Sequence, residues 1–306
     1  MSRRPDRVHI REVGPRDGFQ NEPERIPTDE KVRLINALSR TGLKRIEVAS
    51  FVRADVIPQL SDGAEVLARI DTPEDVRLMV LVPNSKGLDN ALKAREKFHE
   101  ATIFVSASET HNKKNVNRAI AETMADNDVM ARRITEAGLG CAAVIATSFG
   151  CPYEGKVALD RVLDLAERFA EAGATEIGFG DTTGMANPAY VSEFFTAALE
   201  RLAGVEVTAH FHNTRGQGLA NAFAALEAGC TSFESSFGEL GGCPVPPGST
   251  GNIATEDLVS MFHEMGVATG ISLPALIDTA RDVQDFLGRK LTSHSIVAGP
   301  VQWAHA

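Results

Sequence analysis

The sequence predicts a single α/β domain over residues 1–306, a (β/α)8 TIM barrel with a short C-terminal helical extension. Short β-branched runs alternate with longer segments in which apolar residues recur every three to four positions, which is the helical period. A glycine repeatedly ends the helical segment just before the next strand. No long linker or low-complexity stretch separates these units, so one closed barrel fits better than a doubly wound sheet.

The β-branched runs are the expected strands, and each forms one β-α unit with the helical segment that follows it. The amphipathic spacing of those segments is clear in Val32-Ile35-Leu38 and in Val162-Leu165-Phe169. Eight strands are expected, at Val8–Val13, Arg45–Ala49, Leu78–Val82, Thr102–Val105, Ala142–Ala146, Glu176–Phe179, Glu206–Phe211 and Ser232–Ser235.

The glycines that end the helical segments follow one pattern. A glycine tolerates the left-handed backbone that closes a helix, so it is typical of the position just before a chain reversal. The pattern occurs at Thr41-Gly42-Leu43, Ala137-Gly138-Leu139, Ala172-Gly173-Ala174 and Ala228-Gly229-Cys230. Each of these triplets directly precedes an expected strand, which supports the division into β-α units.

Composition and charge exclude several classes of function. The 43% hydrophobic content of the 306 residues is enough for a large core. With 31 Lys and Arg against 41 Asp and Glu, the net charge of −10 provides no general attraction for nucleic acid or an anionic membrane. The basic N-terminus is not followed by the apolar region of a signal peptide, and no later run could span a bilayer. We therefore expect a cytoplasmic protein that binds neither nucleic acid nor membrane.

The cysteines are not spaced as a metal or disulfide framework. Cys141, Cys151, Cys230 and Cys243 contain no Cys-x-x-Cys pair, so we expect no disulfides in this chain. Three of them are expected to be small buried hydrophobic residues. Cys243 differs because it lies in the loop Gly241-Gly242-Cys243-Pro244, where an exposed thiol would be mobile and reactive.

Two histidines end the seventh expected strand. Residues i and i+2 of a strand point the same way, so His210 and His212 can bind one ion while Phe211 faces the other side. An isolated His-x-His is more often a pair of ordinary core or surface histidines. The metal-site interpretation therefore depends on what the other strand ends bring to the same place.

The C-terminal rim of a barrel collects the ends of all its strands, and enzymes on this fold carry their chemistry there. One carboxylate, two imidazoles and an amide oxygen would form a mixed oxygen and nitrogen site suited to Mg²⁺ or Mn²⁺ acting as a Lewis acid. The residues expected at this rim are Arg16, Asp17, Glu47, Asp181, Thr182, His210, His212 and Asn252.

Each of these residues also has a purely structural interpretation. Arg16 and Asp17 could form a salt bridge, Glu47 could cap a loop, and Asp181 could anchor a turn. Asn252 precedes a helix, so it is either the capping residue of that helix or an oxygen ligand. The convergence of all of them on one rim favours the functional interpretation.

At these residues the chain resembles the 3-hydroxy-3-methylglutaryl-CoA lyases, within a wider group of barrel metallolyases and Claisen-condensing enzymes. The resemblance runs from about Val8 to Leu287. It rests on EVGPRDGFQNE at 12–22, IEVASFV at 46–52, KKNVN at 113–117, GCPYEGK at 150–156, GDTTGMANP at 180–188 and LGGCPVPPGSTGNIATEDLV at 240–259. GCPYEGK and the glycine loop with its cysteine indicate the lyase branch rather than the isopropylmalate or homocitrate synthases.

The resemblance implies a divalent-metal-dependent retro-Claisen cleavage of 3-hydroxy-3-methylglutaryl-CoA to acetyl-CoA and acetoacetate, serving leucine degradation and ketone-body formation. It also implies a homodimer. The implied metal ligands are Asp17, His210, His212 and Asn252, with Mg²⁺ or Mn²⁺ as the ion. Asp17 or His210 would be the general base, and the residues alone do not choose between them.

The resemblance assigns further roles around the substrate. Arg16 would stabilise the enolate oxygen, and Glu47 would orient Arg16 or Asn252. Cys243 would protonate the enolate carbon, with His210 as a relay. The implied acyl-CoA contacts are Gln20, Lys113, Lys114, Asp181, Thr182 and Arg215; the two lysines, in a local basic cluster, would meet the phosphates of CoA.

The chain departs from the family pattern His-x-His-Asp-Thr-Tyr-Gly at Asn213 and Arg215. A lost carboxylate and a gained guanidinium beside the pocket would suit a different acyl group. One alternative is therefore a related lyase for citramalyl-CoA or a longer 3-carboxymethyl analogue. A carbon–carbon condensing synthase and a non-catalytic ligand-binding barrel are two further alternatives.

Overall fold

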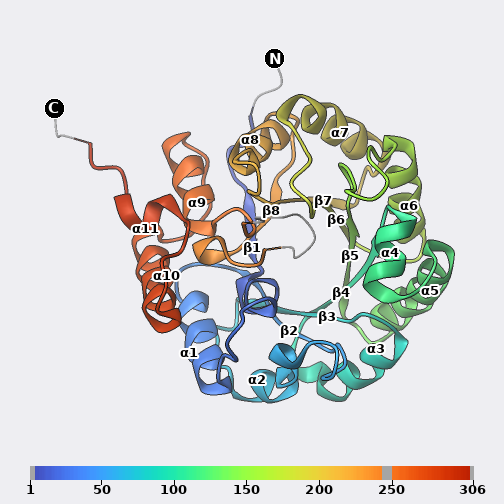
Figure 1. The fold of residues 1–306 in the computed structure, drawn as a ribbon, viewed down its shortest axis with the longest axis horizontal. Coiled ribbons are helices and arrows are strands. Elements are labelled where there is room, and N and C mark those ends of the chain that lie inside the picture. Colours follow the sequence, from blue (N-terminus) through green and yellow to red (C-terminus); the bar gives the residue numbers. More distant parts are fainter. Residues whose placement is uncertain (1–3, 243–249, 304–306) are drawn as a thin grey trace.

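Eight parallel strands close into a barrel in which each strand pairs with its neighbours in chain order (Figure 1). The structure is a computed structural model and describes residues 4–242 and 250–303. The strands are β1 (His9–Glu12), β2 (Arg45–Ser50), β3 (Arg77–Leu81), β4 (Glu100–Ser106), β5 (Gly140–Ala146), β6 (Glu176–Asp181), β7 (Glu206–Phe211) and β8 (Ser232–Ser235). β8 closes the barrel by pairing with β1. The predicted fold class and all of the expected strands are confirmed.

Helices surround the strands on the outside, as Figure 1 shows. They are α1 (Thr28–Ser39), α2 (Gly63–Arg69), α3 (Ser85–Ala91), α4 (Glu109–Val116), α5 (Ile120–Glu136), α6 (Leu159–Glu171), α7 (Pro188–Arg201), α8 (Gly218–Glu227), α9 (Thr255–Glu264), α10 (Leu273–Leu287) and α11 (His294–Ala298). Shorter turns are η1 (Gly14–Gly18), η2 (Pro58–Leu60), η3 (Leu92–Lys97) and η4 (Phe237–Glu239). α10 packs on α1 and α9, and α11 packs on α9 and α10, so the predicted helical extension is present.

The predicted glycines do close helices. Gly42, Gly138, Gly173 and Gly229 all have positive φ angles, between 75° and 106°. At Gly42 a second constraint is visible, because a Cβ there would lie 2.3 Å from the carbonyl oxygen of Gly270. This position therefore requires glycine both for its backbone angle and for the close approach of the loop before α10.

The core lies between the strands and the ring of helices. Outward-facing strand residues such as Ile46, Val80 and Ile103 are fully buried there. A group of aromatic rings, among them Phe149, Phe179 and Phe194, packs where β6 meets α7. The cysteines that the structure describes, Cys141, Cys151 and Cys230, are buried and unpaired, as predicted.

A chain of alternating charges runs from the exposed Arg77 at the N-terminal end of β3 into the inside of the barrel, and we call it the ion-pair column. Its members, from the N-terminal end of the strands upward, are Arg77, Glu100, Arg45, Glu176, Arg11 and Glu234. Arg77 Nε and Arg45 Nη2 both lie 2.5 Å from Glu100, and Arg45 also pairs with Glu176. Arg11, which is 1% exposed, pairs with Glu176 and lies 2.6 Å from Glu234 Oε1.

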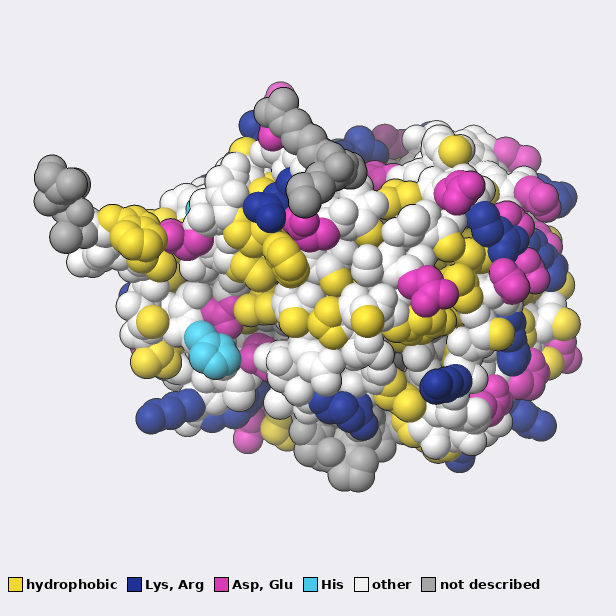
Figure 2. Space-filling model, turned by 90° about the horizontal axis from the view of Figure 1, so that it is seen from above, with side chains coloured by type: hydrophobic (Ala, Val, Ile, Leu, Met, Phe, Trp, Pro, Cys, Tyr) yellow, Lys and Arg dark blue, Asp and Glu magenta, His cyan; other side chains and the backbone are white. Residues whose placement is uncertain are grey.

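The face drawn in Figure 2 carries acidic and basic side chains that are interspersed rather than gathered into one basic surface. Exposed ion pairs on the described surface include Arg53 with Asp55 and Arg40 with Asp71. Within the described residues, no helix combines the length and the apolar character needed to cross a membrane.

Candidate active site

The turn η1 brings Arg16 and Asp17 to the C-terminal rim directly after β1. It is a single π-helical turn in which the backbone N–H groups of both residues donate to the carbonyl oxygen of Val13, at 3.1 and 2.7 Å. A Cβ on Gly14 would lie 2.5 Å from the ring of Phe237, so this close approach requires glycine. The tight turn is why two consecutive residues both reach the same cavity.

Asp17, His210 and His212 form one cluster. One ligand atom from each lies within 4.8 Å of the others, and Nε2 of His210 is 3.1 Å from Nε2 of His212. The two imidazoles therefore face the same way, as their spacing predicts. Two nitrogens bound at a right angle about 2.1 Å from one ion would lie about 3 Å apart, so the observed separation fits a shared metal ion.

Asn252 completes the cluster from the loop before α9. Its Nδ2 donates to Asp17 Oδ2 at 2.7 Å and to the carbonyl of Leu240 at 3.0 Å. Its Oδ1 is buried and has no hydrogen-bond partner within residues 4–242 and 250–303. The helix-capping interpretation is wrong, because α9 begins at Thr255 with Ala254 at its N-cap. A buried amide oxygen without a partner beside Asp17 fits a metal ligand.

Arg16 is held between two carboxylates. Its Nε donates to Glu47 Oε2 at 2.6 Å and its Nη1 donates to Asp17 Oδ1 at 2.7 Å. Burial disfavours the charged form of Asp17, but Arg16, His210 and His212 outweigh it and hold the pKa of Asp17 below its usual value. The contact expected between Glu47 and Arg16 is present, whereas Asn252 is bound by Asp17 instead.

Glu234 is a site residue that the sequence patterns do not indicate. It lies on β8 directly opposite His210 in the strand register, and its Oε2 is 2.8 Å from Nδ1 of His210. Burial alone would raise the pKa of Glu234, but Arg11 and His210 lower it to about 2. Burial alone would lower the pKa of His210, but the hydrogen bond to Glu234 raises it. An acid inside a short buried strand is the signal that could have identified it.

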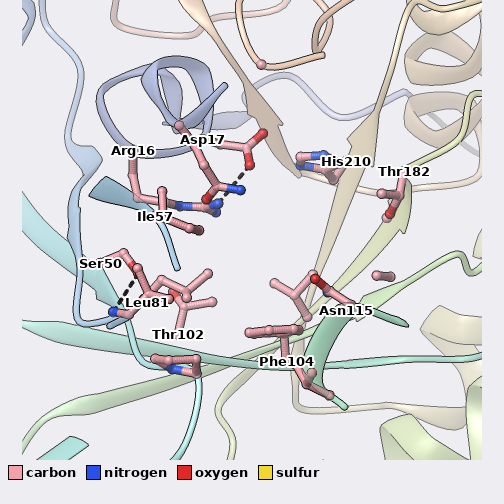
Figure 3. A pocket seen from close by; sticks show the side chains of 18 of the residues that line it. Arg16, Asp17, Ser50, Ile57, Leu81, Thr102, Phe104, Asn115, Thr182 and His210 are labelled. Atoms are coloured by element: carbon pink, nitrogen blue, oxygen red, sulfur yellow. Dashed lines mark hydrogen bonds and ion pairs between the residues drawn. The ribbon is translucent and has the colours of Figure 1, made fainter. Parts of the chain in front are cut away.

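A cavity of about 430 Å³ adjoins the cluster. Figure 3 shows Arg16, Asp17 and His210 facing it from one side and Leu81, Thr102 and Phe104 from the other. The predicted site residues that line the cavity are Arg16, Asp17, Gln20, Glu47, Lys114, Thr182, His210 and His212. The cavity therefore joins the polar cluster to an apolar wall of the barrel interior.

Other predicted site residues lie elsewhere in the described part of the chain. Asp181 Oδ1 accepts from the N–H groups of Met185 and Ala186, so this carboxyl anchors the turn after β6, and burial raises its pKa to about 7. Arg215 Nη1 donates to the carbonyls of Thr183 and Gly184 at 2.8 and 2.7 Å. The substrate contacts expected of Asp181 and Arg215 remain predictions.

Lys113 and Cys243 are two further predicted site residues. Lys113 is exposed in the last turn of α4, one residue before Lys114, which does line the cavity. Its contact with CoA remains a prediction. Cys243 lies outside the described residues.

A (β/α)8 barrel whose C-terminal rim joins a candidate metal cluster to a partly buried arginine and an open cavity is the arrangement of a barrel enzyme with metal-assisted chemistry. The family model described as HMGL-like matches residues 7–283. The chain belongs to the HMGL-like family of lyases.

Relatives extend over nearly the whole chain. The hydroxymethylglutaryl-CoA lyase YngG of Bacillus subtilis is 44% identical over 292 residues, which are 95% of this chain and 97% of that protein. The human mitochondrial hydroxymethylglutaryl-CoA lyase is 39% identical over 293 residues, covering 96% of this chain and 90% of that protein. A solved HMG-CoA lyase from Acinetobacter baumannii, in complex with coenzyme A and 3-methylmalate, superposes with a TM-score of 0.93 at 41% identity, covering 100% of this chain and 99% of that one.

Proposed function

We propose that this protein cleaves 3-hydroxy-3-methylglutaryl-CoA to acetyl-CoA and acetoacetate with the help of Mg²⁺ or Mn²⁺. The observation that carries the proposal is the junction of Arg16 with the Asp17, His210 and His212 cluster on one side of the cavity. The names of the relatives support the same substrate, and the coenzyme A in the Acinetobacter structure supports an acyl-CoA partner.

The residues that would hold the ion are Asp17, His210, His212 and Asn252. Their donors are oxygens and imidazole nitrogens without a thiolate, which suits Mg²⁺ or Mn²⁺. When bound, the ion supplies Lewis acidity to the hydroxyl and carboxylate oxygens of the substrate. The unpartnered Oδ1 of Asn252 is the clearest support for this set.

Cleavage begins with removal of the hydroxyl proton of the substrate. Asp17 or His210 would take this proton. If His210 donates from Nδ1 to Glu234 and binds the ion through Nε2, it has no lone pair left for the proton. The carboxylate of Asp17 keeps a further acceptor site beside its bonds to Arg16 and Asn252, so Asp17 is the better suited base. As the proton leaves, the new ketone forms at the former carbinol carbon and the adjacent carbon–carbon bond breaks.

The electron pair of the broken bond passes to the thioester as an enolate. A guanidinium carries five N–H donors, and the bonds to Glu47 and Asp17 leave others free for the enolate oxygen. Glu47 is buried and fixes Arg16 in this position. Cys243 would then protonate the enolate carbon and release acetyl-CoA.

The mouth of the cavity has groups suited to CoA. Lys114 lines it and lies 5.0 Å from the ring centroid of Tyr153, which also lines it. A lysine beside an exposed ring offers a charge for phosphate and an apolar surface for the pantetheine chain. Gln20 and Thr182 line the same cavity and would contact the acyl group.

A lyase for citramalyl-CoA or a longer analogue is not favoured. That alternative depends on Asn213 and Arg215 facing the substrate. Both side chains have partners within the protein, Asn213 with Glu239 and Arg215 with two backbone carbonyls. The homodimer, the cytoplasmic location and the roles in leucine degradation and ketone-body formation are further parts of the proposal.

The test is steady-state cleavage of 3-hydroxy-3-methylglutaryl-CoA beside citramalyl-CoA and longer analogues, with Mg²⁺ or Mn²⁺ and again after chelation. We expect the methylglutaryl substrate to give the highest kcat/KM and chelation to abolish turnover. Preference for another acyl-CoA would overturn the substrate, and activity that survives chelation would overturn the metal. Release of free CoA from acetyl-CoA and a keto acid would indicate a synthase, and metal binding without turnover would indicate a ligand-binding barrel.

A further inference from the structure

We infer that Glu234 is the positioning residue of the metal centre, because it fixes which ring nitrogen of His210 carries the proton and so turns the lone pair of Nε2 toward a divalent cation. The inference rests on the metal site of the proposed function and not on the identity of the acyl group.

The contacts of Glu234 determine the tautomer of His210. Glu234 Oε1 accepts from Arg11 Nη1 at 2.6 Å, and Oε2 lies 2.8 Å from Nδ1 of His210. A carboxylate can only accept hydrogen bonds, so Nδ1 of His210 must be the donor. Nε2 is then the nitrogen with the free lone pair, and it is the atom that faces Nε2 of His212 at 3.1 Å.

Arg11 keeps Glu234 in place as a charged acceptor. The guanidinium of Arg11 is 1% exposed and does not lose its proton in proteins, so a buried carboxylate beside it is stabilised in the ionised form. Because one oxygen of Glu234 is bound by Arg11 and the other by His210, the carboxylate cannot turn away from the imidazole. The ion-pair column therefore ends at the metal cluster.

His212 has no equivalent support. Its Nδ1 is buried and has no hydrogen-bond partner among the described residues. The two candidate histidine ligands therefore differ, because a carboxylate orients His210 and none is bound to Nδ1 of His212 among the described residues. Carboxylates that orient metal-bound histidines typically account for a 10- to 100-fold share of metal affinity. We therefore expect removal of the Glu234 carboxylate to weaken metal binding by this factor.

The ion-pair column offers a matched control. Glu100 is also a buried glutamate inside the barrel, and it pairs with Arg45 and Arg77 at 2.5 Å. It has no contact with His210 among the described residues, because Arg45, Glu176, Arg11 and Glu234 lie between them in the column. Glu100→Gln therefore removes a comparable buried charge without altering the metal cluster.

The experiment is a Mn²⁺ titration of the full chain, followed by the paramagnetic resonance signal of free Mn²⁺, for the wild type, Glu234→Gln, Glu234→Asp and Glu100→Gln. Circular dichroism and thermal melts check that each variant is folded. We expect Glu234→Gln to weaken Mn²⁺ binding about 10- to 100-fold. Glu234→Asp keeps the carboxylate and should recover most of that loss, and Glu100→Gln should leave Mn²⁺ affinity unchanged.

A second measurement does not depend on any variant at position 234 being folded. Long-range ¹H–¹⁵N spectra of the wild-type protein without added metal report which nitrogen of each histidine carries the proton, and His210→Gln identifies the signals of His210. We expect the proton on Nδ1. A proton on Nε2 alone would overturn the inference.

The other outcomes separate this inference from the proposed function. A folded Glu234→Gln variant with wild-type Mn²⁺ affinity would overturn the positioning role, as would an equal loss in Glu100→Gln, since the effect would then be general to buried charge. A wild-type protein that binds no Mn²⁺ would overturn both proposals. A different preferred acyl-CoA would overturn only the proposed substrate.

Discussion

Asn213 donates a hydrogen bond from Nδ2 to Oε1 of Glu239 at 3.1 Å, and its own Oδ1 accepts from the backbone N–H of Gly218 at 3.2 Å. Glu239 is buried in the short turn after β8 and has a left-handed backbone with φ of 63°. The amide at position 213 therefore ties the end of β7 to the turn that begins the glycine-rich loop. A carboxylate at this position would face the carboxylate of Glu239.

Asn213→Asp should reduce stability without changing the acyl-CoA preference. The variant replaces a hydrogen bond to a buried carboxylate by repulsion between two acids, so we expect a loss of about 1–3 kcal/mol in the free energy of unfolding. Urea denaturation measures the loss, and Glu239→Gln in the same chain should restore most of it. A stable Asn213→Asp variant with an altered substrate ranking would show that position 213 acts on the substrate.

Arg16→Lys should lower kcat about 100- to 1000-fold, because a lysine cannot hold Glu47 and Asp17 in two directions and still face the enolate oxygen. Steady-state kinetics with 3-hydroxy-3-methylglutaryl-CoA measures this, and a thermal melt checks folding. Arg53→Lys is the control, since Arg53 forms an exposed pair with Asp55 and is not one of the residues that line the cavity. A kcat within a fewfold of the wild type would refute the oxyanion role of Arg16.

Asn252→Ala should weaken metal binding, because it removes both the unpartnered Oδ1 and the hydrogen bond that Nδ2 gives to Asp17. We expect an affinity loss of about 10- to 100-fold by Mn²⁺ titration, with part of the activity recovered at high metal concentration. Asn90→Ala, at an exposed asparagine on α3, is the control. Unchanged Mn²⁺ affinity in Asn252→Ala would remove Asn252 from the ligand set.

Asp181→Asn should change how stability depends on pH. Burial raises the pKa of Asp181 from 3.8 to about 7, so the folded protein keeps a proton that the unfolded chain releases. The stability that this group contributes is full below pH 4 and is lost as the pH rises toward 7. The wild type should lose about 4 kcal/mol across this range, and the variant should not.

Thermal melts at pH 4 and pH 8 check this prediction. The asparagine keeps the Oδ1 acceptor for Met185 and Ala186, so the anchored turn is preserved. The melting temperature of Asp181→Asn, relative to the wild type, should increase from pH 4 to pH 8. Parallel curves would mean that Asp181 is ionised throughout the range.

Local sequence patterns were sufficient for the fold. A short β-branched run predicts each strand, and a glycine such as Gly42 predicts the end of the helix before the next strand. The β-α units could therefore be predicted without knowledge of long-range contacts. The barrel then brought His210, His212 and Asp17 together, because the ends of parallel strands meet at one rim.

Contacts across the barrel could not be predicted in the same way. Glu234 acquires its role only through the register of β7 and β8, which sets it opposite His210. Asn213 donates a hydrogen bond to Glu239, which lies in a different loop. Arg215 donates to backbone carbonyl oxygens, and a pattern of side chains in the sequence does not predict such contacts. Asn252 could be interpreted as a helix cap or as a metal ligand, depending on where α9 begins. The sequence predicts the first residue of a helix only to within a few positions, so it could not distinguish the two interpretations.

The ion-pair column also limits how this chain can be divided. A cut between β4 and β5 would leave Arg11, Arg45 and Arg77 with only Glu100 in the first half, and Glu176 and Glu234 in the second half without either of their arginines. Arg11 in the first half would lose both of its glutamate partners, and Glu176 in the second half would lose both of its arginine partners. A buried charge without a partner strongly disfavours folding, so neither half should fold alone. Co-expressed halves should assemble only with each other, which makes this barrel a natural two-fragment reporter of chain complementation.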